Sequence, residues 1–142
     1  MLMKLLFTIG LLLIGIQFIP YGKDHTNPKV ESSPKWDSPQ TKGLFMRACG
    51  DCHSNETQWP TYSNIAPISW FITAHVEEGR EHFNVSMWNI QKKQKADEAA
   101  EEVEEGDMPL ASYLLAHPEA KLNDSEREAL IKGLKNTFGE EE

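Results

Sequence analysis

The stretch ACGDCHSNETQWP, residues 48–60, contains the only two cysteines of the 142-residue chain. Two residues separate Cys49 from Cys52, and His53 follows directly. Covalent haem attachment accounts for all three side chains. Two thiols about one helical turn apart can add to the two vinyl groups of a porphyrin, while the adjacent imidazole ligates the iron. The motif therefore predicts one haem c per chain, bound through Cys49, Cys52 and His53.

Three other interpretations of the motif stay open at the level of sequence. A thioredoxin-like redox pair also uses Cys-x-x-Cys, but it usually lies on a strand-to-helix turn, and the sequence has no alternating β-branched runs typical of strands. A structural zinc site would use both thiols and His53, but the sequence lacks the close second pair of ligands. A disulfide between Cys49 and Cys52 would suit an exported protein and would leave His53 unexplained.

Helical patterns lie on both sides of the motif. Ser38 followed by Pro39 predicts a helix start, with the hydroxyl as cap and proline at the first helical position. Residues 125–128, SERE, predict a capping box for a last helix that stops at Gly139. The expected helices of the domain begin at residue 39 and at about 67 (ending near 79), 86 (ending at 106) and 125. The sequence thus predicts an all-α fold of three to five helices.

The first twenty residues, MLMKLLFTIGLLLIGIQFIP, place Lys4 ahead of an apolar run over 5–19, the order found in an export signal. This run would reach about 22 Å as a helix, short of the roughly 30 Å hydrocarbon core, which favours a cleaved signal. No small-x-small cleavage pattern follows, however, and residues 1–3 and Tyr21 extend the apolar length. We therefore expect residues 1–22 to form a hydrophobic helix that serves as an uncleaved membrane anchor, with a cleaved signal and a soluble exported domain as the alternative.

Residues 23–35 are polar, contain Pro28 and Pro34 and show no apolar period, so we expect a tether before a haem-binding domain over 36–142. The formal net charge of −8 and the scattered basic residues argue against a nucleic-acid partner. The acidic run over 97–107 is expected to be a solvated helical face, and docking of a basic redox partner there is a weaker hypothesis.

The second axial position of the iron is expected to be taken by Met108. This methionine lies between Gly106 and Pro109 in an expected loop, so it does not belong to the apolar face of a helix. His75, on the apolar face of the expected second helix, is the competing ligand, although a core histidine is more usual there. The predicted site residues are Cys49, Cys52, His53 and Met108, with His53 and Met108 bound to the metal.

Three segments in order carry a resemblance to a known family. They are CGDCHSNETQWPTYSNIAPISWFI (49–72), EEGREHFNVSMW (77–88) and GDMPLASYLLAHPEAKLNDSEREALI (106–131). The sequence over about 17–135 resembles the small bacterial haem-binding domain family related to c-type cytochromes. The resemblance implies a small cytochrome c-like helical domain around one covalent haem, behind an N-terminal membrane anchor in the bacterial envelope.

These observations predict an electron carrier rather than an enzyme. We expect a one-electron carrier with His/Met-ligated iron, anchored in the bacterial inner membrane with its haem domain in the periplasm, that serves redox proteins of the envelope. The sequence has no catalytic constellation and lacks the second Cys-x-x-Cys-His of a di-haem peroxidase. The alternative function is a haem-based sensor or ligand-binding module whose sixth ligand can be displaced.

Overall fold

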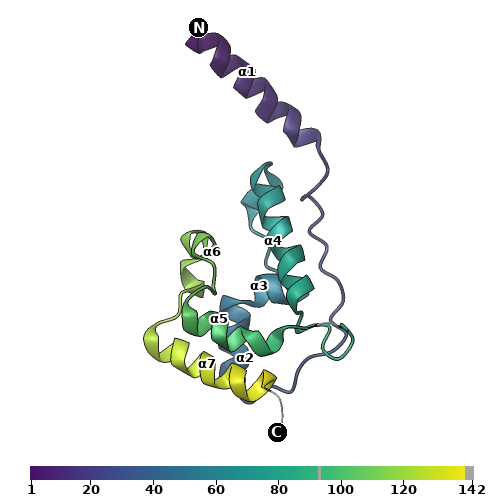
Figure 1. Ribbon diagram of the computed structural model, residues 1–142. Coiled ribbons are helices and arrows are strands. Elements are labelled where there is room, and N and C mark those ends of the chain that lie inside the picture. The colour runs from purple at the N-terminus through teal and green to yellow at the C-terminus, as the bar shows by residue number, and fades with distance from the viewer. Residues whose placement is uncertain (93, 140–142) are drawn as a thin grey trace.

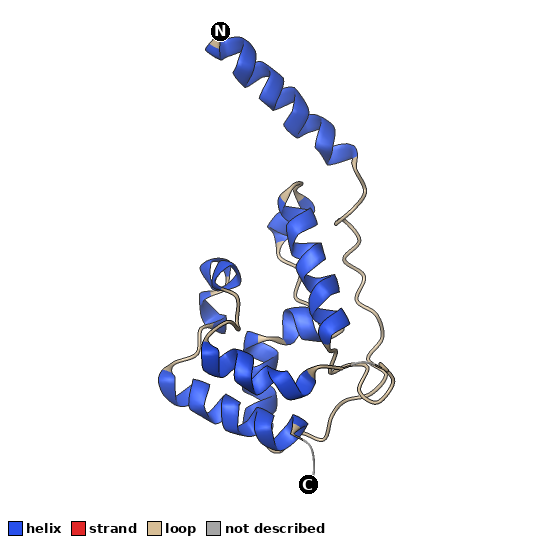
Figure 2. Cartoon of the chain, in the orientation of Figure 1, coloured by secondary structure: helices blue, strands red, loops and turns tan. Residues whose placement is uncertain are grey.

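The computed structural model describes residues 1–92 and 94–139, and the regular structure of this part is helical (Figures 1 and 2). The elements are α1 (Leu2–Gly15), η1 (Ile16–Phe18), α2 (Pro39–Ala48), α3 (Gly50–His53), η2 (Thr61–Asn64), α4 (Ile68–His82), η3 (Ala96–Glu98), α5 (Ala99–Glu105), α6 (Ala111–Ala116), η4 (Pro118–Ala120) and α7 (Asp124–Phe138), where η marks a 3-10 turn. An isolated bridge between Ser32 and Met87 is the only strand-like pairing in the described residues. The expected all-α class is confirmed.

The described part of the expected domain over 36–142 contains six α-helices, α2 to α7, so the expected number of three to five is too low. Residue 93 and residues 140–142 of that domain lie outside the described residues. The additional helices are α3 and α6, of four and six residues. Helices this short contain too few turns for an apolar period to reveal them.

The starts of α2 and α4 agree with the sequence. The Ser38 hydroxyl accepts a hydrogen bond from the Thr41 amide at 3.1 Å, and Pro39 occupies the first helical position. α4 begins at Ile68, directly after Pro67, but it continues three residues past Gly79, which was expected to be near its end. Gly79 therefore lies inside α4 and has another role, which concerns the packing of α3.

The start of α7 lies earlier than its capping motif predicted. The carbonyl oxygen of the Asn123 side chain accepts from the Glu126 amide at 2.9 Å, and the Glu126 carboxylate accepts from the Asn123 amide at 3.0 Å. The capping box at 125–128 is therefore wrong by two residues. The helix ends at Phe138, directly before Gly139, as expected.

The helix expected over 86–106 is wrong in its first half. Met87 forms the bridge to Ser32, residues 88–92 form turns and bends, and regular helix begins only with η3 and α5. Ser86, the expected cap, is buried, and its hydroxyl accepts from the Asn55 amide at 2.9 Å. Asn89 adopts a left-handed conformation with φ 64°, which a continuous α-helix does not allow. Tertiary hydrogen bonds thus prevail over the helix propensity of this segment.

The core lies where α2, α5 and α7 pack together at the end of the molecule far from α1 (Figure 1). Phe45 of α2, Val103 of α5, and Leu130 and Leu134 of α7 are fully or almost fully buried there. Burial of each such side chain stabilises the fold by about 1.5–3 kcal/mol. Three helices distant in sequence are therefore held as one unit beside the cysteine motif.

α1 extends away from the domain, and none of its residues is buried (Figure 1). The hydrophobic helix expected over residues 1–22 is shorter here, because the α-helix ends at Gly15 and the 3-10 turn η1 follows it, and its role as an anchor stays a prediction. Among residues 1–92 and 94–139, no helix has the length and apolar character needed to cross a membrane. The end of α1 is fixed to the domain by Gln17, whose side-chain amide donates to the Ala66 carbonyl at 2.8 Å and accepts from the Ala66 amide N–H at 3.0 Å.

The expected tether over 23–35 contains no helix, but it lies against the domain. The Asn27 side chain donates to the Thr57 carbonyl at 2.9 Å. The imidazole of His25 stacks on the indole of Trp59 with 4.5 Å between ring centroids. This segment is thus held along the loop that follows the cysteine motif.

Candidate functional site

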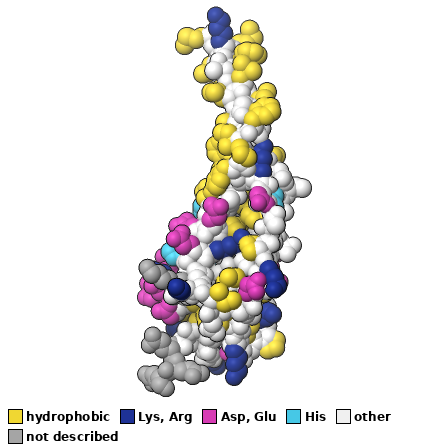
Figure 3. All heavy atoms as spheres, turned by 90° about the vertical axis from the view of Figure 1, so that its right-hand side faces the viewer, with side chains coloured by type: hydrophobic (Ala, Val, Ile, Leu, Met, Phe, Trp, Pro, Cys, Tyr) yellow, Lys and Arg dark blue, Asp and Glu magenta, His cyan; other side chains and the backbone are white. Residues whose placement is uncertain are grey.

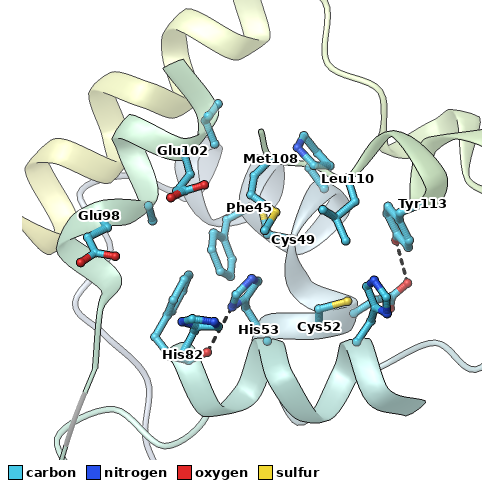
Figure 4. A pocket seen from close by; sticks show the side chains of 18 of the residues that line it. Phe45, Cys49, Cys52, His53, His82, Glu98, Glu102, Met108, Leu110 and Tyr113 are labelled. Atoms are coloured by element: carbon cyan, nitrogen blue, oxygen red, sulfur yellow. Dashed lines mark hydrogen bonds between the residues drawn. The ribbon is translucent and has the colours of Figure 1, made fainter. Parts of the chain in front are cut away.

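A cavity of about 390 Å³ lies beside α3, and its size is in the range of small-molecule and cofactor sites. Side chains from α2, α4, α5 and α7 line it, and apolar atoms make up most of its surface. All four predicted site residues line this cavity: Cys49, Cys52, His53 and Met108. Figure 4 shows Met108 on one side and His53 with Cys52 on the other. The fold thus brings together residues that lie up to 59 positions apart, from Cys49 to Met108.

His53 presents a neutral imidazole to the cavity. Its Nδ1 lies 3.2 Å from the Phe83 carbonyl oxygen, which can only accept, so Nδ1 carries the proton and Nε2 has a free lone pair. Burial lowers the pKa of His53, which keeps the ring uncharged at neutral pH. The Phe83 ring stacks on the imidazole with 4.2 Å between centroids. A fixed, neutral ring with a free Nε2 has the chemistry of an axial iron ligand.

The two cysteines lie at the turn between α2 and α3. Both are half-buried free thiols. The amides of Cys52 and His53 both donate to the Cys49 carbonyl, at 3.2 and 3.0 Å, so one tight turn holds all three residues. Burial raises the pKa of Cys49 to about 12 and that of Cys52 to about 11, which keeps both as neutral thiols at the rim of an apolar cavity.

Gly79 allows α4 to approach this turn closely. A Cβ atom at Gly79 would lie 2.7 Å from the Cys52 carbonyl oxygen and 2.9 Å from the Cys52 Cβ. Every other residue type would separate α3 from α4. This close packing of α3 on α4 was not predicted from the sequence, because a glycine near the end of an apolar period also predicts a helix stop.

Met108 lies in the loop between α5 and α6, half-buried against the core. Gly106 ends α5 in a left-handed conformation with φ 87°, and the Met108 amide then donates to the Glu102 carbonyl at 3.0 Å. His75, the competing ligand, also lines the cavity, from the middle of α4. Its Nδ1 donates to the Phe71 carbonyl at 2.9 Å, so its Nε2 is free as well. The geometry therefore keeps both residues as candidates.

A hydrogen bond joins the segment of Met108 to the cysteine turn. The Tyr113 hydroxyl on α6 donates to Asp51 Oδ2 at 2.7 Å, and Asp51 Oδ1 accepts from the Gln58 amide at 2.8 Å (Figure 4). Burial, followed by this hydrogen bond, raises the pKa of Tyr113, so the hydroxyl keeps its proton. We name this pair the Tyr113–Asp51 link. This hydrogen bond was not predicted from the sequence, because Asp51 and Tyr113 are 62 positions apart and no local pattern connects them.

The rim of the cavity is charged. Glu98 of η3 and Glu102 of α5 line it (Figure 4). The Lys95 Nζ lies 3.4 Å from the Glu98 carboxylate. The expected solvated acidic run thus contributes two carboxylates to the cavity. Among residues 1–92 and 94–139, no group of three or more His, Cys, Asp or Glu side chains could hold a metal ion alone, so the structural-zinc interpretation finds no complete ligand set.

The apolar lining of the cavity suits the ring of a porphyrin, and the free Nε2 of His53 suits its iron, which defines a small all-α haem-binding protein. Residues 11–136 match the sequence model of the haem-binding domain. Because the match spans most of the chain, the protein belongs to the haem-binding domain family and binds haem. Neither a curated protein nor a solved structure matches it.

Proposed function

We propose that this protein is a c-type one-electron carrier whose haem is held covalently by Cys49 and Cys52 and whose iron is ligated by His53 and Met108. The single observation that supports the proposal is that all four side chains line one cavity, from two segments separated by α4 and α5. Bound haem supplies a one-electron iron couple, and His/Met ligation is the pair that raises its potential.

The protein residues have separate tasks in this proposal. The Phe83 carbonyl fixes the imidazole of His53 so that Nε2 points to the metal position. The buried thiols stay protonated until they react with the porphyrin. Phe45 and Leu134 exclude water from the cavity, and low polarity around a haem further tunes its potential. A carrier needs no acid-base group beside the iron, so we do not assign an enzymatic reaction.

A haem-based sensor is the second candidate function. It is favoured by one observation, that His75 and Met108 both line the cavity and each carries an atom that can ligate iron. Exchange between two protein ligands, or displacement of one by a small molecule, would then report a signal. Carbon monoxide distinguishes the two candidates, because the ferrous sensor should bind it and the ferrous carrier should not.

The proposed location is the bacterial inner membrane, with α1 in the lipid and the haem domain in the periplasm. α1 is apolar apart from Lys4 and Thr8, and none of its described residues is buried, so most of its apolar side chains are available to lipid. The proposed partners are redox proteins of the envelope. The net charge of −8 favours those with a basic docking surface.

The test uses the full chain produced together with the cytochrome maturation machinery. The ferric protein should be low-spin with a methionine-to-iron charge-transfer band, and the ferrous protein should not bind carbon monoxide. Met108→Ala should lose the band and become high-spin. Met46→Ala is the matched control, because Met46 also packs against the core but does not line the cavity. An unchanged spectrum in Met108→Ala, with a changed one in His75→Ala, would replace Met108 by His75.

Covalent attachment is tested separately. Cys49→Ala combined with Cys52→Ala should still form the cavity, but its haem should be extracted by acidified organic solvent. The parent protein should retain its haem under the same treatment. Equal retention in both proteins would contradict a thioether linkage.

A further inference from the structure

The end of the domain next to α1 presents exposed apolar side chains. Ile65, Ile68 and Phe71, near the start of α4, are 54%, 47% and 54% exposed, and Phe18 and Ile19 after α1 are 84% and 44% exposed. In Figure 3, hydrophobic side chains continue from α1 onto the adjoining end of the domain. We call these five residues the α4 end face.

Contacts on both sides of this face hold α1 next to it. Gln17 makes its two hydrogen bonds with Ala66, which lies between Ile65 and α4. At Gly22, with φ 76°, a Cβ would lie 2.7 Å from the Ser69 carbonyl oxygen, so the chain after α1 touches the first turn of α4. The Tyr21 hydroxyl also donates to the Glu77 carboxylate at 3.0 Å. The end of α1 can therefore leave the α4 end face only if these contacts break.

The length of α1 makes this face relevant to a bilayer. Its 14 residues reach about 21 Å, whereas the hydrocarbon core is roughly 30 Å thick. A short apolar segment is accommodated by bilayer thinning or by neighbouring apolar groups that enter the interface. The α4 end face supplies such groups, and Lys23, whose ammonium group donates to the Gln17 carbonyl, places a cation beside the lipid head groups.

We infer, on the basis of the proposed attachment through α1, that the α4 end face rests on the surface of a lipid bilayer. The domain is then held against the membrane in one orientation. The ring centroids of Phe71 and His75 are 4.1 Å apart, and His75 lines the haem cavity. The cavity therefore begins one helical turn from the lipid surface, where a membrane-embedded redox partner can reach it.

The test uses the haem-loaded full chain in vesicles of zwitterionic and anionic phospholipid. Photoreactive p-benzoylphenylalanine is placed at Phe7 in α1, at Phe71 in the α4 end face, or at Leu115, which is 89% exposed on α6 and serves as the matched apolar control. After irradiation, lipid adducts are measured by mass spectrometry. Adducts are expected at positions 7 and 71, with at least about fivefold fewer at position 115. Each protein must first show the parent haem spectrum.

The other outcomes separate the inference from the proposed attachment. Lipid adducts at position 7 alone would keep α1 in the membrane and overturn the inference. A covalent dimer from position 71 would show that a second copy covers the face, and this also overturns it. No adduct at position 7 would contradict the attachment and the inference together. In Gln17→Ala, adducts at position 71 should fall severalfold while those at position 7 persist.

Discussion

The Tyr113–Asp51 link connects the two sides of the haem cavity through one hydrogen bond. Asp51 lies between the two cysteines, and Tyr113 lies five residues after Met108. The donor and acceptor are 2.7 Å apart and partly shielded from water, and hydrogen bonds to charged groups are stronger than neutral ones. The link should therefore keep the Met108 loop closed over the cavity.

Tyr113→Phe removes only the hydroxyl of this link. We expect the variant to keep its haem but to bind exogenous imidazole at least about tenfold more tightly, because a lost hydrogen bond to a charged group costs about 1.5–3 kcal/mol and 1.4 kcal/mol corresponds to tenfold. The measurement is an optical titration of the ferric protein. Tyr21→Phe is the control, since it removes a tyrosine-to-carboxylate hydrogen bond of 3.0 Å outside the cavity. Equal affinities in all three proteins would show that the link does not restrain the sixth ligand.

Local sequence predicted some residues of the site and not others, for a physical reason. Cys49, Cys52 and His53 belong to one contiguous motif, so a shared site can be predicted for them from spacing alone, and the structure places all three at one cavity. Asp51 and Tyr113 are 62 positions apart, and only the packing of α6 brings them together. The role of Gly79 likewise depends on tertiary packing, because this residue of α4 lies against Cys52 of α3, 27 positions earlier in the chain.

At the level of elements, the contact between α3 and α4 depends on Gly79. Gly79→Ala would place a methyl group against the Cys52 backbone, and overpacking of this kind costs about 1–3 kcal/mol. We expect a lower free energy of unfolding by that amount in guanidinium chloride, together with reduced haem loading. Gly43→Ala in α2 is the control, because a Cβ there meets nothing within 4 Å, and alanine should stabilise that helix by about 0.5–1 kcal/mol. Similar effects of the two substitutions would contradict the close packing of α3 and α4.

The start of α7 should give the protein part of its acid sensitivity. The Asn123 amide, and then Arg47 at 2.8 Å, lower the pKa of Glu126 below its ordinary 4.5. The charged form thus contributes stability above about pH 4.5, and this is lost as the pH falls through the lower pKa of the folded state. Glu126→Gln keeps a capping side chain without the charge. Its melting temperature should lie below that of the parent at pH 7 and approach it near pH 3. A difference that stays constant with pH would contradict this role.

The start of a helix was predictable where residues next to that start determine it. Ser38 and Pro39 start α2 as expected, because the cap needs only its own helix. The helix predicted to start at Ser86 was wrong because tertiary contacts hold this segment. The Ser86 carbonyl accepts hydrogen bonds from the amides of Glu31 and Ser32, at 3.0 and 3.1 Å, which lie 54 or more residues away in the chain. Partners so distant cannot be deduced from helix propensity.

At the level of the whole molecule, the haem cavity is continuous with the hydrophobic core. Phe45, Phe83, Val103 and Leu134 belong to the core cluster and also line the cavity. A group that fills the cavity therefore packs against core side chains of α2, α5 and α7. The stability of the domain and its haem content should be linked.

The haem-free full chain, obtained without the maturation machinery, should unfold at a melting temperature lower by on the order of 10 °C, because about 2 kcal/mol shifts the midpoint of a domain this size by that amount. Amide hydrogen exchange should locate the loss, with faster exchange in α5 and α6 than in the part of α4 that contacts residues 21–22. That part, around Ser69 and Glu77, is also held by the contacts with Gly22 and Tyr21. Equal melting temperatures and equal exchange with and without haem would mean that the fold forms its cavity unaided, and that haem adds redox chemistry but no structural support.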